Sequence, residues 1–250
     1  MNIIVSIITP CYNNKDTISE TINSVINQTF TYWEMLIIDD CSIDGSDIII
    51  QQYCNQDPRI KYLKTEKASG SPALPRNIGL NHAIGDYICF LDSDDCWLPT
   101  KLEDQIKFIT KNNYDFIYSN YEKISFNGYR NHRIIRTKSN SNYYDNLKTC
   151  EIPCLTVLIK KGIINNTRFI HTPKEDYVFW LTILKKGIIA HNTNQVHALY
   201  RESNTSRSSN KKEMIKAQWF ILRHYEKLNF IISLYYMITY IWYGLKKYLK

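Results

Sequence analysis

Glycine is scarce in this sequence, and the turn after its first apolar run contains none. Only 8 of the 250 residues are glycine, and the segment Pro10–Asn14, which follows the apolar run 3–8, has no glycine at all. A dinucleotide-binding unit needs a GxGxxG turn at this place, because glycine lets the backbone approach the pyrophosphate. This absence excludes a dinucleotide-dependent oxidoreductase.

The cysteines lack the spacing of a metal or redox site. Seven cysteines are scattered along the chain, no pair has CxxC spacing, and no histidine cluster completes a zinc site. The sequence opens directly into a strand pattern, without the basic region and cleavage signal of a secretory leader. These absences favour a protein of the reducing cytosol, whose thiols behave as small hydrophobic groups.

Most of the chain also lacks net charge. Residues 1–200 carry 21 basic and 21 acidic side chains, whereas residues 201–250 carry ten basic and three acidic ones, which accounts for the formal net charge of +7. The excess of positive charge therefore lies in the tail alone, and it indicates only what the tail binds. Nucleic acid is disfavoured as that partner, because the basic residues flank an aromatic, apolar segment that suits a membrane surface.

That segment, residues 228–245, is 18 residues long and has no charged side chain. Its length lies at the lower limit for crossing a bilayer, and its Tyr and Trp residues favour the membrane interface. One stripe of the expected helix is polar or hydroxyl-bearing: Ser233, Tyr236, Tyr240 and Tyr243. The opposite face is apolar. We predict that the tail 211–250 is an amphipathic helical segment lying on a membrane; packing on its own domain and a true span are the alternatives.

Apolar periodicity predicts alternating strands and helices. The expected strands are 3–8, 33–38, 60–63, 87–91, 116–119 and 155–159. The expected helices are 16–28, 46–55, 76–83, 100–112 and 173–186. This order indicates the α/β class, with a single Rossmann-like, mainly parallel sheet flanked by helices. We expect one domain, 1–210, in which residues 1–120 bind a nucleotide and residues 121–210 shape a partner site, with 137–146 as a loop or flap.

Three carboxylates follow the buried strand 87–91 within four residues, in Asp92-Ser93-Asp94-Asp95. They should emerge at the carboxyl end of the strand, where α/β sheets place their ligand sites. Two unit charges 4 Å apart repel by roughly 4 kcal/mol at an effective dielectric constant of about 20. The cluster therefore needs a cation, and oxygen ligands favour Mg2+ or Mn2+. The alternative is a solvated turn without a metal.

Five segments together resemble the GT-A-fold glycosyltransferases of family 2, a bacterial group that builds surface polysaccharides such as O-antigen and capsule. The matching segments are Ile8–Asn13, Ile38–Ser46, Pro75–Gly79, Gly85–Asp95 and Glu175–Asp176. They follow the order and spacing of the family over residues 3–205, and the tail after Asn210 is not covered. A single acidic motif is weak, but five segments in register are specific.

The resemblance implies a nucleotide site on the first half of the chain. Pro10 and Tyr12 would line the uridine pocket, and Asp40 would accept a hydrogen bond from uracil. Arg76 would reach the base or the diphosphate. For Tyr12 ordinary packing is the alternative, for Asp40 the capping of a turn, and for Arg76 a surface ion pair.

The resemblance also divides the acidic cluster. Asp92 would hold the ribose hydroxyls, and Ser93 would join the nucleotide-sugar site. Asp94, together with Asp95, would bind the Mn2+ or Mg2+ ion that bridges both phosphates. Arg201 begins a polar loop, 201–210, that resembles the loop covering the diphosphate in the family, and it is counted with the nucleotide-sugar site.

Asp176 would be the general base of a single, inverting displacement. Thr172, Pro173 and Glu175 match a capping box, which gives Glu175 a structural role and leaves Asp176 free to face the acceptor. The positive end of the helix would keep Asp176 ionised. A second capping carboxylate is the alternative for this residue.

The implied activity is the metal-dependent transfer of a hexose, glucose or galactose, from a UDP-sugar to a saccharide on a polyprenyl diphosphate. Such an enzyme would work in the cytoplasm, attached peripherally to the inner face of the membrane. A catalytically inactive nucleotide-sugar-binding or scaffold protein of the same fold is the alternative. An aspartyl phosphatase would leave four of the five segments unexplained.

Overall fold

The computed structural model describes residues 3–202 and 211–246, and within them ten strands form one sheet. The strand order is β3-β2-β1-β4-β9-β6-β10-β5, with β7 paired to β6 and β8 to β10. Strands β3, β2, β1 and β4 are mutually parallel. Strands β9, β5, β7 and β8 run antiparallel to their neighbours. The α/β prediction is confirmed, although only the first half of the sheet is purely parallel.

The strand boundaries show where each edge of the sheet ends. The strands are β1 Val5–Cys11, β2 Trp33–Asp39, β3 Ile60–Lys64, β4 Tyr87–Phe90, β5 Cys96–Trp97, β6 Phe116–Ile124, β7 Arg130–Ile135, β8 Asn140–Ser141, β9 Leu158–Lys160 and β10 Ala190–Arg201. Strand β1 runs through Pro10, beyond the expected end at residue 8. Because β1 and β4 are parallel, their carboxyl ends bring Tyr12 and the acidic cluster to the same edge.

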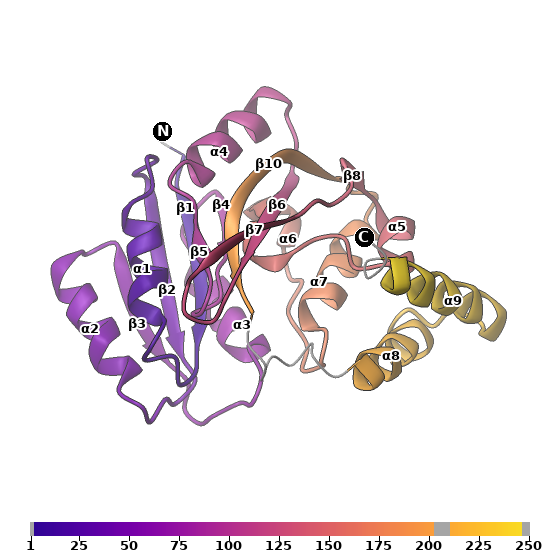
Figure 1. The fold of residues 1–250 in the computed structure, drawn as a ribbon, viewed down its shortest axis with the longest axis horizontal. Coiled ribbons are helices and arrows are strands. Elements are labelled where there is room, and N and C mark those ends of the chain that lie inside the picture. Colours follow the sequence, from indigo (N-terminus) through magenta and orange to yellow (C-terminus); the bar gives the residue numbers. More distant parts are fainter. Residues whose placement is uncertain (1–2, 203–210, 247–250) are drawn as a thin grey trace.

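Helices cover both faces of this sheet (Figure 1). They are α1 Ile18–Ile26, α2 Ser46–Gln56, α3 Ala73–His82, α4 Lys101–Lys111, α5 Tyr143–Lys148, α6 Lys161–Ile164, α7 Glu175–Leu184, α8 Lys211–Phe220 and α9 Phe230–Lys246, with a 3-10 turn at Cys154–Thr156 and a π-helical segment at Ile221–Tyr225. Helices α1, α2 and α4 pack with Ile7 and Ile37 on one face. Helices α3, α6 and α7 pack with Ile8 and Ile38 on the other. The alternation of inward positions along β1 and β2 therefore divides the core into two layers.

Helix α3 lies unusually close to the sheet because of a glycine. A Cβ atom at Gly79 would lie 2.5 Å from Ile8 Cγ2 and 3.0 Å from Ile38 Cδ1. Any side chain there would push α3 away from β1 and β2. Gly79 thus sets the depth at which α3 carries Arg76 toward the carboxyl edge of the sheet.

The stretch 137–146 is more ordered than expected. Strand β8 pairs with β10, and α5 follows with its own capping box. The Asn142 side chain accepts a hydrogen bond from the Asp145 backbone N–H at 3.0 Å, and Asp145 Oδ2 accepts one from the Asn142 N–H at 3.3 Å. The prediction of a loop or flap is therefore wrong here, because a local cap and one strand pair order the segment.

The tail folds back onto the domain. Tyr236 and Met237 of α9 and Ile221 and Leu222 of the π-helical segment form a third apolar cluster with α5 and α7. The polar stripe faces inward: Ser233 is fully buried, and Tyr240 lies against Lys174. The alternative of packing on its own domain therefore describes the hydroxyl stripe, whereas the apolar face stays exposed and its contact with a membrane stays a prediction.

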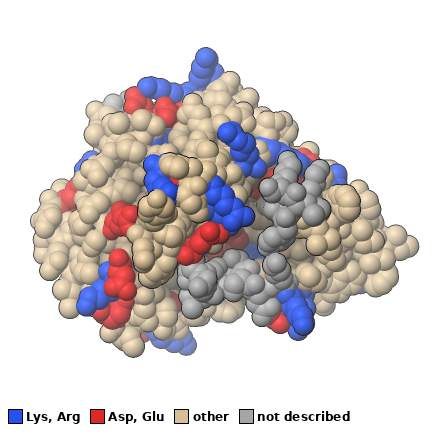
Figure 2. Space-filling view, viewed as in Figure 1, with Lys and Arg blue, Asp and Glu red and all other residues tan. Residues whose placement is uncertain are grey.

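That exposed face is large. The apolar side chains of α9 that are at least two-fifths exposed are Phe230, Ile231, Ile232, Leu234, Tyr235, Ile238, Ile241, Trp242 and Leu245. On the face seen in Figure 2, the end of the molecule where α9 lies shows a broad area without Lys, Arg, Asp or Glu. No helix in the two described ranges combines the length and the apolar character needed to cross a bilayer.

Candidate functional site

A cavity of about 920 Å3 lies at the carboxyl edge of the parallel strands. Among its lining residues are seven of the ten predicted site residues: Tyr12, Arg76, Asp92, Asp94, Asp95, Asp176 and Arg201. Folding thus brings the acidic cluster, the expected base and both expected arginines to one cavity. Pro10, Asp40 and Ser93 do not line it.

The residues Asp92–Asp95, called the acidic loop, are held in place by hydrogen bonds to α1 and to the turn that follows β1. Asn14 Oδ1 accepts a hydrogen bond from Ser93 Oγ at 2.8 Å, and Thr17 Oγ1 donates to the Ser93 carbonyl at 3.0 Å. Thr21 Oγ1 donates to the Asp95 carbonyl at 2.8 Å. Ser93 therefore supports the loop, and its predicted contact with the nucleotide sugar stays a prediction.

Asp95 and Arg201 are joined at the base of the loop. Asp95 is 2% exposed, and its Oδ1 accepts a hydrogen bond from the Arg201 backbone N–H at 2.9 Å. Burial, followed by the charges of Asp94 and Asp92, raises the pKa of Asp95 well above its usual range. Each of these effects opposes a third negative charge in the loop, and a bound cation would offset them.

Arg201 braces the loop from the end of β10. Its Nε donates to the Asp94 carbonyl at 2.7 Å, its Nη1 to the Phe126 carbonyl at 2.6 Å, and its Nη2 to Glu20 Oε2 at 2.5 Å. The guanidinium thus ties the acidic loop to α1 and to the β6–β7 turn. Its predicted role toward the diphosphate stays a prediction, and loop residues 203–210 lie outside the described residues.

Arg76 bridges the two halves of the cavity. It is 2% exposed, its Nη2 donates to Asp92 Oδ1 at 2.6 Å, and its Nη1 donates to Glu175 Oε1 at 2.8 Å. The ring of Phe169 lies 5.3 Å from the guanidinium carbon. The surface ion pair considered as an alternative is therefore wrong, because Arg76 is a buried link between the acidic loop and α7.

The capping box expected at Thr172 and Glu175 does not form. Helix α7 begins at Glu175, and its N-cap residue is Lys174, which makes no side-chain capping bond. Glu175 instead pairs with Arg76. The expectation that Glu175 has a structural role is right, but its partner comes from α3, 99 positions earlier in the chain.

Asp176 faces the cavity from the first turn of α7. Its Oδ1 accepts a hydrogen bond from the Tyr177 backbone N–H at 2.7 Å. Burial, and then the neighbouring Glu175 carboxylate, raises the pKa of Asp176 to about 6, against a smaller opposite effect of Arg76. The expected direction was the reverse, since the helix end was thought to favour the ionised form. A carboxylate with a pKa near 6 is still ionised at pH 7 and is a stronger base than an ordinary Asp.

The carboxylates fit a divalent cation that shares its ligands with a phosphate. In residues 3–202 and 211–246, no three His, Cys, Asp or Glu side chains are grouped so that they could hold a metal by themselves. Mg2+ is commonly held by one or two carboxylates plus substrate phosphates, so a smaller set is enough. Asp94 and Asp95 both line the cavity and would be the protein ligands.

Of the three residues Pro10, Tyr12 and Asp40, which are expected to bind uridine, only Tyr12 lines the cavity. The Tyr12 side chain is 52% exposed at the cavity, so ordinary packing does not explain it. Asp40 is buried; its Oδ1 accepts from Thr65 Oγ1 at 2.9 Å and its Oδ2 from the Ser69 N–H at 2.9 Å. Pro10 lies inside β1, and the contacts of Pro10 and Asp40 with uridine stay predictions.

The far wall of the cavity was missed by sequence reasoning. It contains Tyr121 of β6, Tyr200 of β10 and the segment 150–155. The two tyrosine rings meet edge to face, with centroids 5.8 Å apart. No motif marks these residues, because they converge only when β10 pairs with β6.

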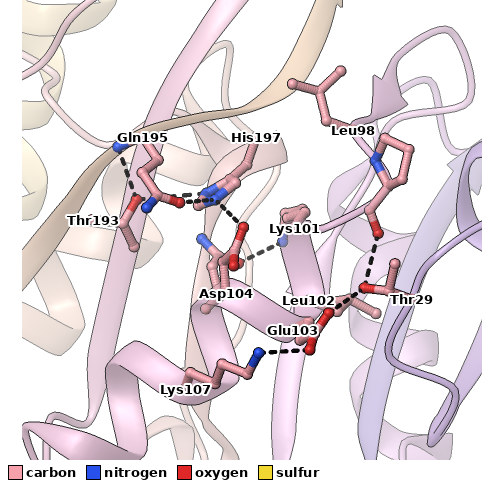
Figure 3. Close-up of polar contacts among 12 residues, drawn as sticks. Thr29, Leu98, Lys101, Leu102, Glu103, Asp104, Lys107, Thr193, Gln195 and His197 are labelled. Carbon is pink, nitrogen blue, oxygen red and sulfur yellow. Dashed lines mark hydrogen bonds and ion pairs between the residues drawn. The ribbon is translucent and has the colours of Figure 1, made fainter.

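A second polar cluster lies between α4 and β10 (Figure 3). His197 is 1% exposed, and its Nε2 lies 3.0 Å from Gln195 Oε1 and 3.5 Å from Asp104 Oδ2. Burial, and then the charge of Lys101, lowers the pKa of His197 to about 4. His197 is thus a neutral strand residue at pH 7 whose polar partners are protein side chains, and it does not belong to the cavity.

The family model and the similar proteins of known sequence are all glycosyltransferases. Residues 6–165 match Glycosyl transferase family 2. The chain is 39% identical over 248 residues to the putative teichuronic acid biosynthesis glycosyltransferase TuaG of Bacillus subtilis, covering 98% of this chain and 97% of that protein. It is 42% identical over 245 residues to the UDP-Glc:alpha-D-GlcNAc-diphosphoundecaprenol beta-1,3-glucosyltransferase WfgD of Escherichia coli, covering 98% and 94%.

Solved structures agree in fold. The TarS fragment 1-349 of S. aureus in complex with UDP-GlcNAc matches with a TM-score of 0.73 at 20% identity, covering 95% of this chain and 71% of that chain. The mannosyltransferase PcManGT of Pyrobaculum calidifontis, in complex with GDP-Man and Mn2+, matches with a TM-score of 0.68 at 15% identity, covering 90% and 64%. The predicted GT-A fold is confirmed.

Proposed function

The chain belongs to glycosyltransferase family 2, and from that premise we propose that it transfers a hexose from a UDP-sugar to a saccharide carried on a polyprenyl diphosphate. The observation that best supports this proposal is that the acidic loop after β4 and Asp176 of α7 line the same cavity. The name of WfgD describes transfer from UDP-Glc to a GlcNAc-diphosphoundecaprenol. Glucose and galactose are the candidate sugars, and the product would enter a bacterial surface polysaccharide.

The proposed reaction is one inverting displacement. The acceptor hydroxyl oxygen attacks the anomeric carbon, the bond from that carbon to the diphosphate oxygen breaks, and the hydroxyl proton passes to Asp176. One base is enough for this, whereas a retaining mechanism through a covalent intermediate would need a nucleophile as well. The raised pKa of Asp176 supports the role of base.

The nucleoside diphosphate would lie over the acidic loop. Asp94 and Asp95 would hold Mg2+ or Mn2+, which neutralises the charge that develops on the leaving diphosphate. Tyr12 offers an exposed aromatic face on which the uracil ring could stack. Asp92, oriented by Arg76, would accept hydrogen bonds from the ribose hydroxyls.

The exposed face of α9 would attach the protein to the cytoplasmic side of the membrane. Its apolar residues recur at helical spacing, and Trp and Tyr are residues that settle at the interface. Lys227 and Lys246 bracket the segment in the sequence, which suits anionic lipid. This attachment would bring the cavity to an acceptor that is itself embedded in the membrane.

The test is UDP release by the full chain with UDP-Glc and UDP-Gal, each with a GlcNAc- or GalNAc-diphospholipid. We expect release that depends on the acceptor and yields a β-linked product from the α-linked donor. Binding of UDP without turnover on any donor and acceptor pair would favour the inactive scaffold. An α-linked product would overturn the inverting displacement.

A further inference from the structure

One buried glutamine of the tail binds residues on both sides of the proposed base. Gln218 of α8 is fully buried. Its Oε1 accepts a hydrogen bond from Lys174 Nζ, and its Nε2 donates to Tyr177 Oη at 2.9 Å. Lys174 directly precedes the pair Glu175–Asp176 and Tyr177 directly follows it. Both ends of one amide group therefore hold the turn that carries Asp176.

The same turn is fixed by two further contacts to the surrounding helices. Tyr177 Oη donates to the Asn146 carbonyl of α5 at 2.9 Å. Lys174 Nζ lies 4.4 Å from the centre of the Tyr240 ring of α9. In a buried setting such a network is rigid, because each lost hydrogen bond would leave a polar group without compensation.

The first turn of α7 depends on contacts of this kind because it has no side-chain cap of its own. Arg76 holds it from the side of the acidic loop through Glu175, and Gln218 holds it from the side of the tail. We infer that Gln218 is a positioning residue that keeps Asp176 turned toward the acceptor, so that the tail is part of the transfer machinery as well as a membrane attachment. This inference rests on the proposed role of Asp176 as base.

The experiment uses the full chain with Gln218→Met, which keeps the volume of the side chain and removes both hydrogen-bonding ends. A displaced base lowers kcat without changing donor binding. We expect kcat to fall about tenfold, since a misplacement of about 1 Å can cost up to 100-fold. The KM for the UDP-sugar and the calorimetric affinity for UDP should stay within about twofold of the unchanged protein. Lys216→Ala, exposed on the same helix, is the control and should match the unchanged protein.

Two further variants keep the inference falsifiable if Gln218→Met folds poorly. Tyr177→Phe removes the hydroxyl that accepts from Gln218 and donates to the Asn146 carbonyl, and it should lower kcat in the same way. Gln218→Glu retains an acceptor for Lys174 and should recover part of the loss. A Gln218→Met protein that melts earlier but has the unchanged kcat per folded molecule would overturn the inference, and so would an equal loss in donor affinity.

A failure of the positioning role of Gln218 can be distinguished from a failure of the proposed base Asp176. If Asp176→Asn abolishes transfer while Gln218→Met leaves kcat unchanged, only the positioning role fails. If Asp176→Asn retains full kcat, the assignment of the base fails, whatever the glutamine variant does.

Discussion

Arg76 and Glu175 form a buried ion pair that joins α3 to the first turn of α7, with Nη1 2.8 Å from Oε1. Their side chains are 2% and 5% exposed. The second terminal nitrogen of Arg76 reaches Asp92 in the acidic loop. One guanidinium therefore sets the relation between the proposed donor end and the proposed acceptor end of the cavity.

Replacing Arg76 with Met should destabilise the fold strongly. Breaking a buried ion pair by removing one partner costs about 3–5 kcal/mol, because the remaining charge stays buried. Denaturant unfolding measures the change. The control is Lys107→Met, which removes an exposed pair with Glu103 and should leave the free energy of unfolding nearly unchanged. Equal losses in the two variants would contradict a special role for the Arg76 bridge.

Asp176→Asn should remove the base and leave donor binding intact. We expect kcat to fall by about 10²–10⁴, the range that general base catalysis contributes. UDP affinity, measured by calorimetry, should be unchanged because Asp176 is not placed at the nucleotide. A variant with normal kcat would refute the assignment.

The pH dependence of transfer should report Asp176. Its pKa of about 6 means that acid protonates the base, so kcat should fall below about pH 6 by roughly tenfold per pH unit. The raised pKa also means that the folded protein binds the proton more tightly than the unfolded chain. Its stabilising effect is complete below pH 3.8 and is lost as the pH rises through 6.

Thermal unfolding gives an independent check of that pKa. Asp176→Asn cannot ionise, so it should melt higher than the unchanged protein at pH 7.5, and the difference should shrink toward pH 4. A difference that does not depend on pH would show that the pKa of Asp176 is not raised.

Removal of the divalent cation should stop turnover. EDTA, and separately Asp94→Asn, should lower UDP release by about 100-fold or more, because the charge of the leaving diphosphate then lacks its counter-ion. Added Mn2+ or Mg2+ should restore the chelated protein but not the variant. Asp47→Asn on α2 is the control carboxylate. Full turnover in EDTA would exclude the metal.

The exposed face of α9 should bind anionic membranes. Ile238→Ser should weaken sedimentation with phosphatidylglycerol vesicles by roughly tenfold, through loss of apolar area. Ile48→Ser on α2 is a matched control, since Ile48 is 61% and Ile238 60% exposed. Point changes are preferable to deletion of the tail, because Tyr236 and Met237 belong to the core. Equal binding by both variants would exclude α9 as the attachment face.

Local pattern was sufficient for much of the fold. The alternating apolar runs predicted β1, β2, β3, β4 and their helices within a few residues, because each segment follows its own periodicity. Strands β5, β7 and β8 were not predicted, and β9 was predicted without its antiparallel pairing, because these strands depend on partners elsewhere in the chain. The capping box was assigned to Thr172 although it forms at Asn142, since capping signatures are short and recur by chance.

The sequence by itself determined that carboxylates follow a buried strand, that Tyr12 follows another, and that the tail has a hydroxyl stripe opposite an apolar face. These features follow from neighbours in the chain. Only the tertiary structure decided that Arg76 pairs with Asp92 and Glu175, that Gln218 holds the turn of Asp176, and that the hydroxyl stripe faces inward. The reason is physical: a buried polar group must find its partner in space, and sequence distance carries no information about which one it finds.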